Sequence, residues 1–144
     1  MINDDTIKLL KECNAGIKMG VSSIEDILDN VKNDTLKSIL KDSLDEHNRL
    51  GDETHKMLTE YNDEGKEPNV MAKGMSWLKT NMMLAVNECD ETVADLMTDG
   101  CDMGVKSLSK YLNKYKAADE KAKDIAKKLI SMEAQLSVNM RPYL

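Results

Sequence analysis

Apolar residues recur with helical spacing along almost the whole chain, and this periodicity limits the chain to an all-helical fold. The stripes run through 3–32, 35–62, 70–86, 88–116 and 120–140. Apolar residues three and four positions apart share one face of a helix. Because only two of the 144 residues are proline, the helices can be long and uninterrupted. We therefore expect an all-α protein with a core of aliphatic and methionine side chains.

The breaks between these stripes carry turn and capping residues. Asn33-Asp34-Thr35 predicts a turn that caps a new helix, and Ala117-Ala118-Asp119 predicts a second turn. Gly65 suits the end of the second helix, and Pro68 marks a loop after it. The chain therefore divides into a hairpin at 3–62, a crossover at 63–87 and a hairpin at 88–140.

The two predicted hairpins share an internal repeat. Residues 16–24, Gly-Ile-Lys-Met-Gly-Val-Ser-Ser-Ile, correspond to residues 100–108, Gly-Cys-Asp-Met-Gly-Val-Lys-Ser-Leu. The same offset carries the turn at 33–34 onto 117–118. Matching sequence and matching turns together indicate a duplicated helical hairpin within a single domain, 1–144.

The length of the crossover selects a topology. A 28-residue helix is about 42 Å long. The helix expected inside the crossover spans about 25 Å, and the remaining residues add roughly 25 Å if extended. The chain can therefore return along the whole bundle before the second hairpin starts. This predicts an up-down-down-up order of the four long helices.

The duplicated hairpins, the crossover near Trp77 and the Gly-x-x-x-Gly pair in each half resemble bacterial ferritin-like four-helix-bundle proteins of unknown function. The resemblance covers nearly the whole chain and rests on architecture and the glycine repeats, with no catalytic motif. It implies a ferritin-like up-down-down-up four-helix bundle with a long crossover containing a short helix. The best-known ferritin-like proteins hold two metal ions between the helices, using Glu and Glu-x-x-His ligands from each half.

This sequence departs from that ligand pattern. The second helix has Asp52-Glu53-Thr54-His55, and Glu12 is expected at a similar height on the first helix. In the second half, Leu96 aligns with Glu12 in the repeat and the fourth helix has no histidine, so we do not expect a symmetric di-metal site. A single iron, manganese or zinc ion held by Glu12, Asp52 and His55 is one hypothesis, since carboxylate and imidazole ligands suit these metals. The alternative is a solvated charged edge.

Two features are expected near the middle of the bundle. Glycine inside a helix costs about 1 kcal/mol relative to alanine. The glycine pairs at 16–20 and 100–104 therefore predict a close approach of the first and third long helices, with space for a ligand as the alternative.

His47 occupies a predicted core position, aligned with Met132 in the repeat. We expect it to be hydrogen-bonded to a backbone or hydroxyl group; the alternative is ligation of haem or a soft metal.

Charge and cysteine usage exclude several functions. The net charge of -6 argues against nucleic-acid binding, which needs a basic surface. No segment reaches the roughly 20 apolar residues of a membrane span. The acidic N-terminus does not have the pattern of a signal peptide. The three cysteines, an odd number without metal-ligand spacing, predict reduced thiols in a cytoplasmic protein. Cys13 and Cys101 are expected to act as small hydrophobic core residues.

The expected crossover helix carries methionine and tryptophan side chains, namely Met71, Met75, Trp77 and Met82. They either pack against the bundle or form an interface with a second copy or a protein partner. The sequence has no Ser/His/Asp or Cys/His layout for nucleophilic catalysis and no glycine-rich phosphate loop, so we do not expect an enzyme. The leading hypothesis is a non-catalytic ferritin-like module acting through protein interaction or self-association. The alternative is a metal-binding ferritin-like protein with a degenerate site for iron, manganese or zinc.

Overall fold

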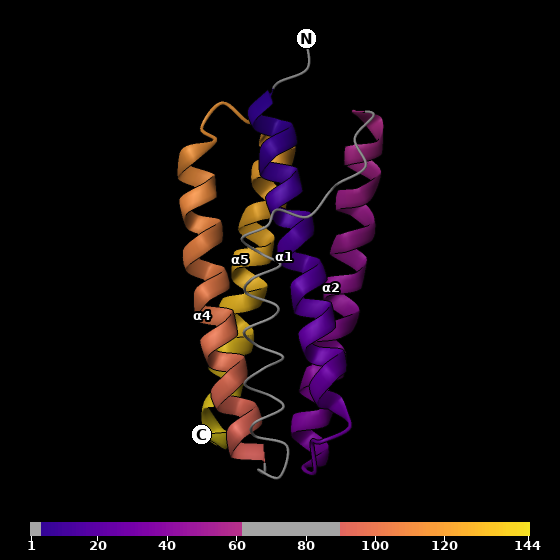
Figure 1. The fold of residues 1–144 in the computed structure, drawn as a ribbon, viewed down its shortest axis with the longest axis vertical. Helices are drawn as coiled ribbons and strands as arrows, with labels where there is room; N and C mark the ends of the chain where they lie inside the picture. The colour runs from indigo at the N-terminus through magenta and orange to yellow at the C-terminus, as the bar shows by residue number, and fades with distance from the viewer. Residues whose placement is uncertain (1–3, 62–89) are drawn as a thin grey trace.

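A computed structural model describes residues 4–61 and 90–144, and this part of the chain is an all-helical bundle (Figure 1). Its elements are α1 (Asp4–Leu28), α2 (Asp34–Glu60), α4 (Asp90–Lys114), α5 (Glu120–Met140) and the short 3-10 helix η1 (Arg141–Tyr143). The all-α prediction from apolar periodicity is confirmed for these residues.

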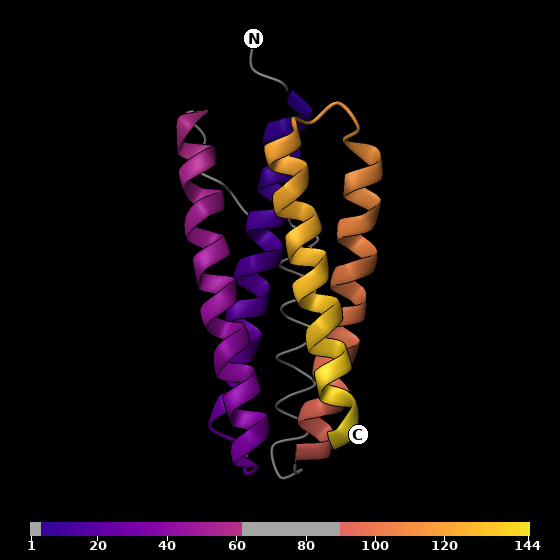
Figure 2. The same cartoon turned by 180° about the vertical axis from the view of Figure 1, so that it is seen from behind.

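The four long helices of the described part lie side by side along the long axis of the molecule. In Figure 1, α1 and α5 run downward while α2 and α4 run upward. The closest neighbours are the two hairpin pairs, α1 with α2 and α4 with α5. Seen from behind, α5 lies between α2 and α4 (Figure 2), and it contacts α1 as well. The crossover expected at 63–87, with Met71, Met75, Trp77 and Met82, lies outside the described residues.

The helix ends confirm both predicted turns. Asn33 is the N-cap of α2 and accepts a hydrogen bond from the backbone N–H of Leu36 at 3.0 Å. Asp119 is the N-cap of α5 and accepts from the backbone N–H of Ala122 at 2.9 Å. The first helix is shorter than the expected 3–32, because the chain turns after Leu28 to reach the Asn33 cap.

The first helix of each hairpin also binds the connecting loop of the other hairpin. The Asp90 carboxylate at the start of α4 accepts the backbone N–H groups of residues 32 and 33 at 2.8 and 3.0 Å. At the opposite end of the bundle, Asp5 and Thr6 of α1 accept the N–H groups of residues 117 and 119 at 3.1 and 2.8 Å. These two sets of hydrogen bonds join the hairpins at both ends.

The apolar core consists of two clusters stacked along the bundle. One cluster includes Leu9, Leu10, Cys13, Ile17, Leu50, Leu108 and Leu129. The other includes Ile24, Leu36, Leu40, Cys101, Leu136 and Met140. Both cysteine side chains are fully buried, which confirms their expected core positions. On every helix, the residues between the two clusters form a middle layer, where the polar core residues His47 and Glu133 lie.

Candidate functional site

A buried histidine–glutamate pair occupies this middle layer. Nε2 of His47 on α2 lies 2.7 Å from Oε1 of Glu133 on α5. His47 is fully buried, and Glu133 is 9% exposed. The other ring nitrogen, Nδ1, lies 2.7 Å from the backbone oxygen of Ser43. Because a carbonyl oxygen can only accept, Nδ1 carries a proton, and the short contact between Nε2 and Oε1 requires a second one. The backbone bond of His47 confirms one expectation from the sequence.

The environment of His47 favours the imidazolium form. Burial lowers the pKa of His47, but the hydrogen bond that the ring donates to Glu133 and the charge of that carboxylate together outweigh burial, and the Ser43 carbonyl acts in the same direction as Glu133. The net effect raises the pKa of His47 above its usual value of 6.5. The second proton therefore resides on Nε2, and the two side chains form an ion pair across two hairpins.

Cys101 of α4 extends this pair. Its thiol lies close enough to Glu133 to be affected by that carboxylate, which also binds the His47 imidazole. Burial raises the pKa of Cys101 strongly, and the negative charge of Glu133 raises it further. Burial also raises the pKa of Cys13 to about 12. Both thiols are therefore protonated at neutral pH and are poor nucleophiles.

The glycines of the repeat surround this layer, but they do not bring α1 and α4 together as expected. A Cβ atom at Gly20 would lie 2.8 Å from Cδ2 and 2.9 Å from Nε2 of His47. At Gly104 it would lie 3.6 Å from Oε2 of Glu133, and at Gly100 no atom would lie within 4 Å. The predicted close helix approach is therefore wrong at these three positions. Gly20 makes room for the imidazole ring, whereas Gly100 faces open space.

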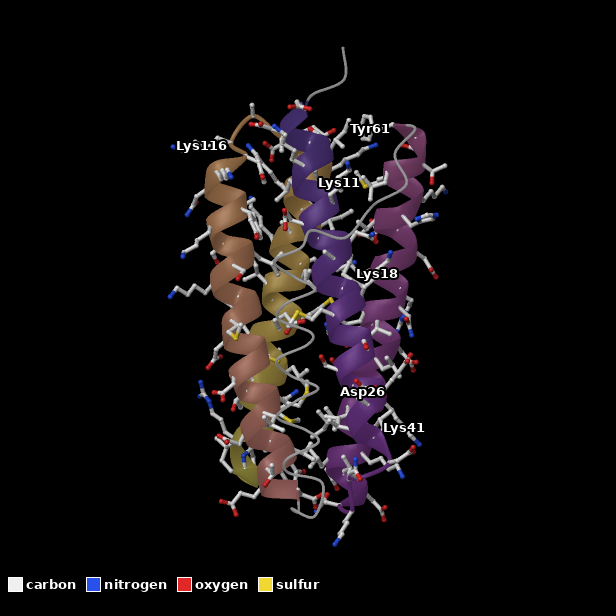
Figure 3. All side chains as sticks on the ribbon, in the orientation of Figure 1. Lys11, Lys18, Asp26, Lys41, Tyr61 and Lys116 are labelled. Atoms are coloured by element: carbon white, nitrogen blue, oxygen red, sulfur yellow. The ribbon has the colours of Figure 1, made fainter. Side chains whose placement is uncertain are left out.

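A hollow of about 80 Å³ lies between α1 and α4 beside Glu133. Glycine and sulfur-containing residues dominate its described lining, which includes Gly16, Met19, Gly20, Met97, Gly100, Cys101, Met103 and Gly104. Figure 3 shows sulfur atoms (yellow) between α1 and α4 at mid-height of the bundle. Of the two predictions for the glycine pairs, space for a ligand therefore describes this region better than a close contact between α1 and α4.

The metal ligands suggested by the sequence are only partly brought together. Asp52 and His55 are exposed on α2 and line the same groove against α1. Glu12 instead lies near Tyr111 and Lys114 of α4, and its Oε2 atom is buried with no hydrogen-bond partner. Burial raises the pKa of Glu12, although Tyr111 and Lys114 oppose this effect. Within residues 4–61 and 90–144, no group of three or more His, Cys, Asp or Glu side chains is arranged to hold a metal ion.

Glu133 was not singled out by the sequence, although a signal for it exists. The repeat aligns Met132 with His47, one position away from the residue that binds the imidazole. The buried positions of α5 include 126, 129, 133, 136 and 140, so Glu133 interrupts an otherwise apolar stripe. A carboxylate at such a position needs a buried partner, and the buried histidine of the other hairpin is a suitable one.

Comparison of the chain with protein-family models, with curated proteins and with solved structures finds no match in any of the three. None of the helices in the described ranges combines the length and apolar character that crossing a membrane requires.

Proposed function

We propose that this chain is a ferritin-like four-helix bundle, formed by duplication of a hairpin, that acts through self-association or a protein partner and not through catalysis. The directions of the described helices support the ferritin-like topology. The repeat and the matching loop contacts of Asp90 and Thr6 support the duplication. The buried thiols suit a reducing compartment, so we assign the protein to the cytoplasm, in a bacterium as the resemblance implies.

The observation that carries this proposal is that the reactive side chains of the core are buried and cannot reach a substrate. A catalytic base must come within hydrogen-bonding distance of a substrate proton. His47 is fully buried, and both of its ring nitrogens are bonded within the protein. Cys13 and Cys101 are buried thiols, not thiolates. In the part of the chain that the structure describes, the core histidine is thus engaged in pairing and the core thiols are not activated nucleophiles, which supports a binding role.

We assign the association surface to the crossover. Methionine and aromatic side chains are enriched in protein interfaces, and Met71, Met75, Trp77 and Met82 are concentrated in this segment. The large apolar side chains that are exposed in the described ranges are Met103, Val138 and Leu144. Single exposed apolar residues of this kind are normal on a monomer surface. The crossover is therefore the better candidate for contacting a second copy.

Sedimentation equilibrium over a wide range of protein concentration tests self-association. We expect a concentration-dependent dimer in the wild type. The double variant Met75→Ala/Trp77→Ala should dimerise about thirtyfold more weakly, as for an interface truncation that costs about 2 kcal/mol. Leu144→Ala removes an exposed apolar side chain elsewhere and is the matched control. A wild type that stays monomeric, or a double variant that dimerises as tightly as the control, would contradict self-association through the crossover.

One observation favours metal binding as a second candidate. Asp52 and His55 lie about one helical turn apart and line one groove, so they can contact the same ion. One iron, manganese or zinc ion per chain in untagged protein, lost in His55→Ala, would support this candidate. Glu12→Gln tests whether the third suggested ligand takes part. Absence of the metal after loading, or its retention in His55→Ala, would reject the site.

A further inference from the structure

Four sulfur atoms belong to residues that line the hollow between α1 and α4. Met19 and Met103 occupy the same position of the repeated Gly-x-x-Met-Gly motif, one in each hairpin. Met97 and Cys101 lie four residues apart on α4, and therefore on one face of that helix. All four residues line the same hollow of about 80 Å³. The repeat thus places thioether donors on both walls, and α4 adds a thiol to the lining.

The charges of these donors match a soft monovalent cation. Thioether sulfur is neutral and soft, and it prefers Cu(I) to the harder divalent ions. Cys101 supplies one negative charge when its thiol loses a proton. The charge of Glu133 is already balanced by His47 at 2.7 Å. One Cu(I) ion bound to one thiolate gives a neutral unit, which avoids the high cost of leaving a net charge in a buried site.

The glycines keep the space for such an ion open. A Cβ atom at Gly100 would have no neighbour within 4 Å, and Gly16 and Gly104 line the same hollow. Met97 and Cys101 are 5% and 0% exposed, so part of the donor set is held inside the bundle. Met103 is 46% exposed, and its flexible side chain gives an incoming ion a first contact near the surface.

We propose that this hollow binds one Cu(I) ion per chain through Sγ of Cys101 and the Sδ atoms of Met19, Met97 and Met103. The S–H bond of Cys101 breaks as the Sγ–Cu bond forms, and the proton leaves to solvent. Copper stays in the +1 state throughout, so no oxidant or reductant is consumed. The proposed ligands include none of the crossover residues assigned to association, and none of the residues Glu12, Asp52 or His55.

Anaerobic competition between the full chain and the Cu(I) chelator bicinchoninate tests the site. All proteins carry Cys89→Ser, which removes the thiol that lies outside the described residues. We expect one Cu(I) ion per chain, with an affinity that falls at least tenfold in Met19→Leu/Met103→Leu. These exchanges keep the volume of the side chains, so the fold should be retained, as circular dichroism will show. Met132→Leu is the matched control, since Met132 packs against the other apolar cluster.

A spectroscopic readout separates the thiolate from the thioethers. The near-ultraviolet absorption of a Cu(I)–thiolate bond should appear on titration of the parent protein. It should be absent in Cys101→Ala and retained, at higher copper concentration, in the double methionine variant. The proposal is overturned if the chelator keeps all the copper. It is also overturned if the triple variant, lacking Cys101 and both methionines, binds Cu(I) as tightly as the parent does.

Discussion

Two equivalent glycines of the repeat show how one neighbouring side chain decides whether a position can hold a residue larger than glycine. Gly20 and Gly104 are equivalent in the repeat, yet their surroundings differ. A Cβ at Gly20 would meet an imidazole ring that hydrogen bonds hold at both nitrogens. At Gly104 the same atom would make an ordinary contact with the Glu133 carboxylate. The asymmetry arises because His47 has no histidine counterpart in the second hairpin.

Alanine substitutions at these positions should have opposite effects on stability. Gly20→Ala should lower the free energy of unfolding by about 1 to 3 kcal/mol, because the methyl group overpacks the His47 ring. Gly100→Ala should raise it by up to about 1 kcal/mol, because alanine is the better helix residue and the space is open. Gly104→Ala is the repeat-matched control for Gly20. Urea unfolding measures all three, and equal effects at positions 20 and 104 would contradict the assignment.

The pairing of His47 with Glu133 shows the limit of sequence patterns at this scale. Apolar periodicity placed His47 in the core, and burial of a histidine requires hydrogen-bond partners. Which residue pairs with His47 depends on the relative rotation and height of α2 and α5, which belong to different hairpins. The repeat aligns His47 with Met132, which is one residue before its actual partner, Glu133. Local patterns do not determine a register between helices to that accuracy.

At the scale of the helices, the ends were predictable because capping is local. Asn33 and Asp119 satisfy backbone N–H groups three residues ahead, so the sequence around each turn contains all the necessary information. The contacts between the hairpins contain no such local signal. Asp90 bonds to residues 32 and 33, nearly 60 positions away, and its role follows from the packing of α4 against the first hairpin.

The contact made by Asp90 should contribute measurably to stability. Asp90→Ala removes a carboxylate that accepts two backbone N–H groups, and we expect the free energy of unfolding to fall by about 1 to 2 kcal/mol. Glu91→Ala is the control, since it removes an adjacent exposed acidic side chain from the same first turn of α4. Hydrogen exchange of the amides of residues 32 and 33 should accelerate in Asp90→Ala alone. Unchanged exchange at these amides would show that the carboxylate does not hold the loop.

For the whole molecule, the pair of His47 and Glu133 is the polar layer between two apolar clusters. It links α2 to α5 and therefore couples one hairpin to the other. A buried ion pair contributes little stability compared with apolar residues of similar size, but losing one partner is costly. The helical periodicity predicted the all-helical fold, whereas this layer follows from the assembled bundle. Its protonation makes the stability of the whole domain dependent on pH.

The direction of that pH dependence follows from the raised pKa of His47. A group with a higher pKa in the folded state stabilises the fold fully below its unfolded pKa, here 6.5, and loses this contribution as the pH rises through the folded value. Below pH 6.5, Glu133→Gln should lower the free energy of unfolding by about 1.5 to 3 kcal/mol, the value of a hydrogen bond to a charged group. The deficit should shrink as the pH rises, because the wild type loses its contribution there.

The variant should also reverse the sign of the His47 contribution. Burial is the largest single influence on the ring and lowers its pKa, and without the Glu133 carboxylate only the smaller effects of the Ser43 carbonyl and the Glu46 charge oppose it. The stability of Glu133→Gln should then increase with pH near the unfolded pKa, where that of the wild type begins to fall. Urea unfolding at a series of pH values measures both slopes. His55→Gln, which removes the other of the two histidines, should keep the wild-type slope. Parallel slopes in the wild type and Glu133→Gln would show that the pair does not hold the proton.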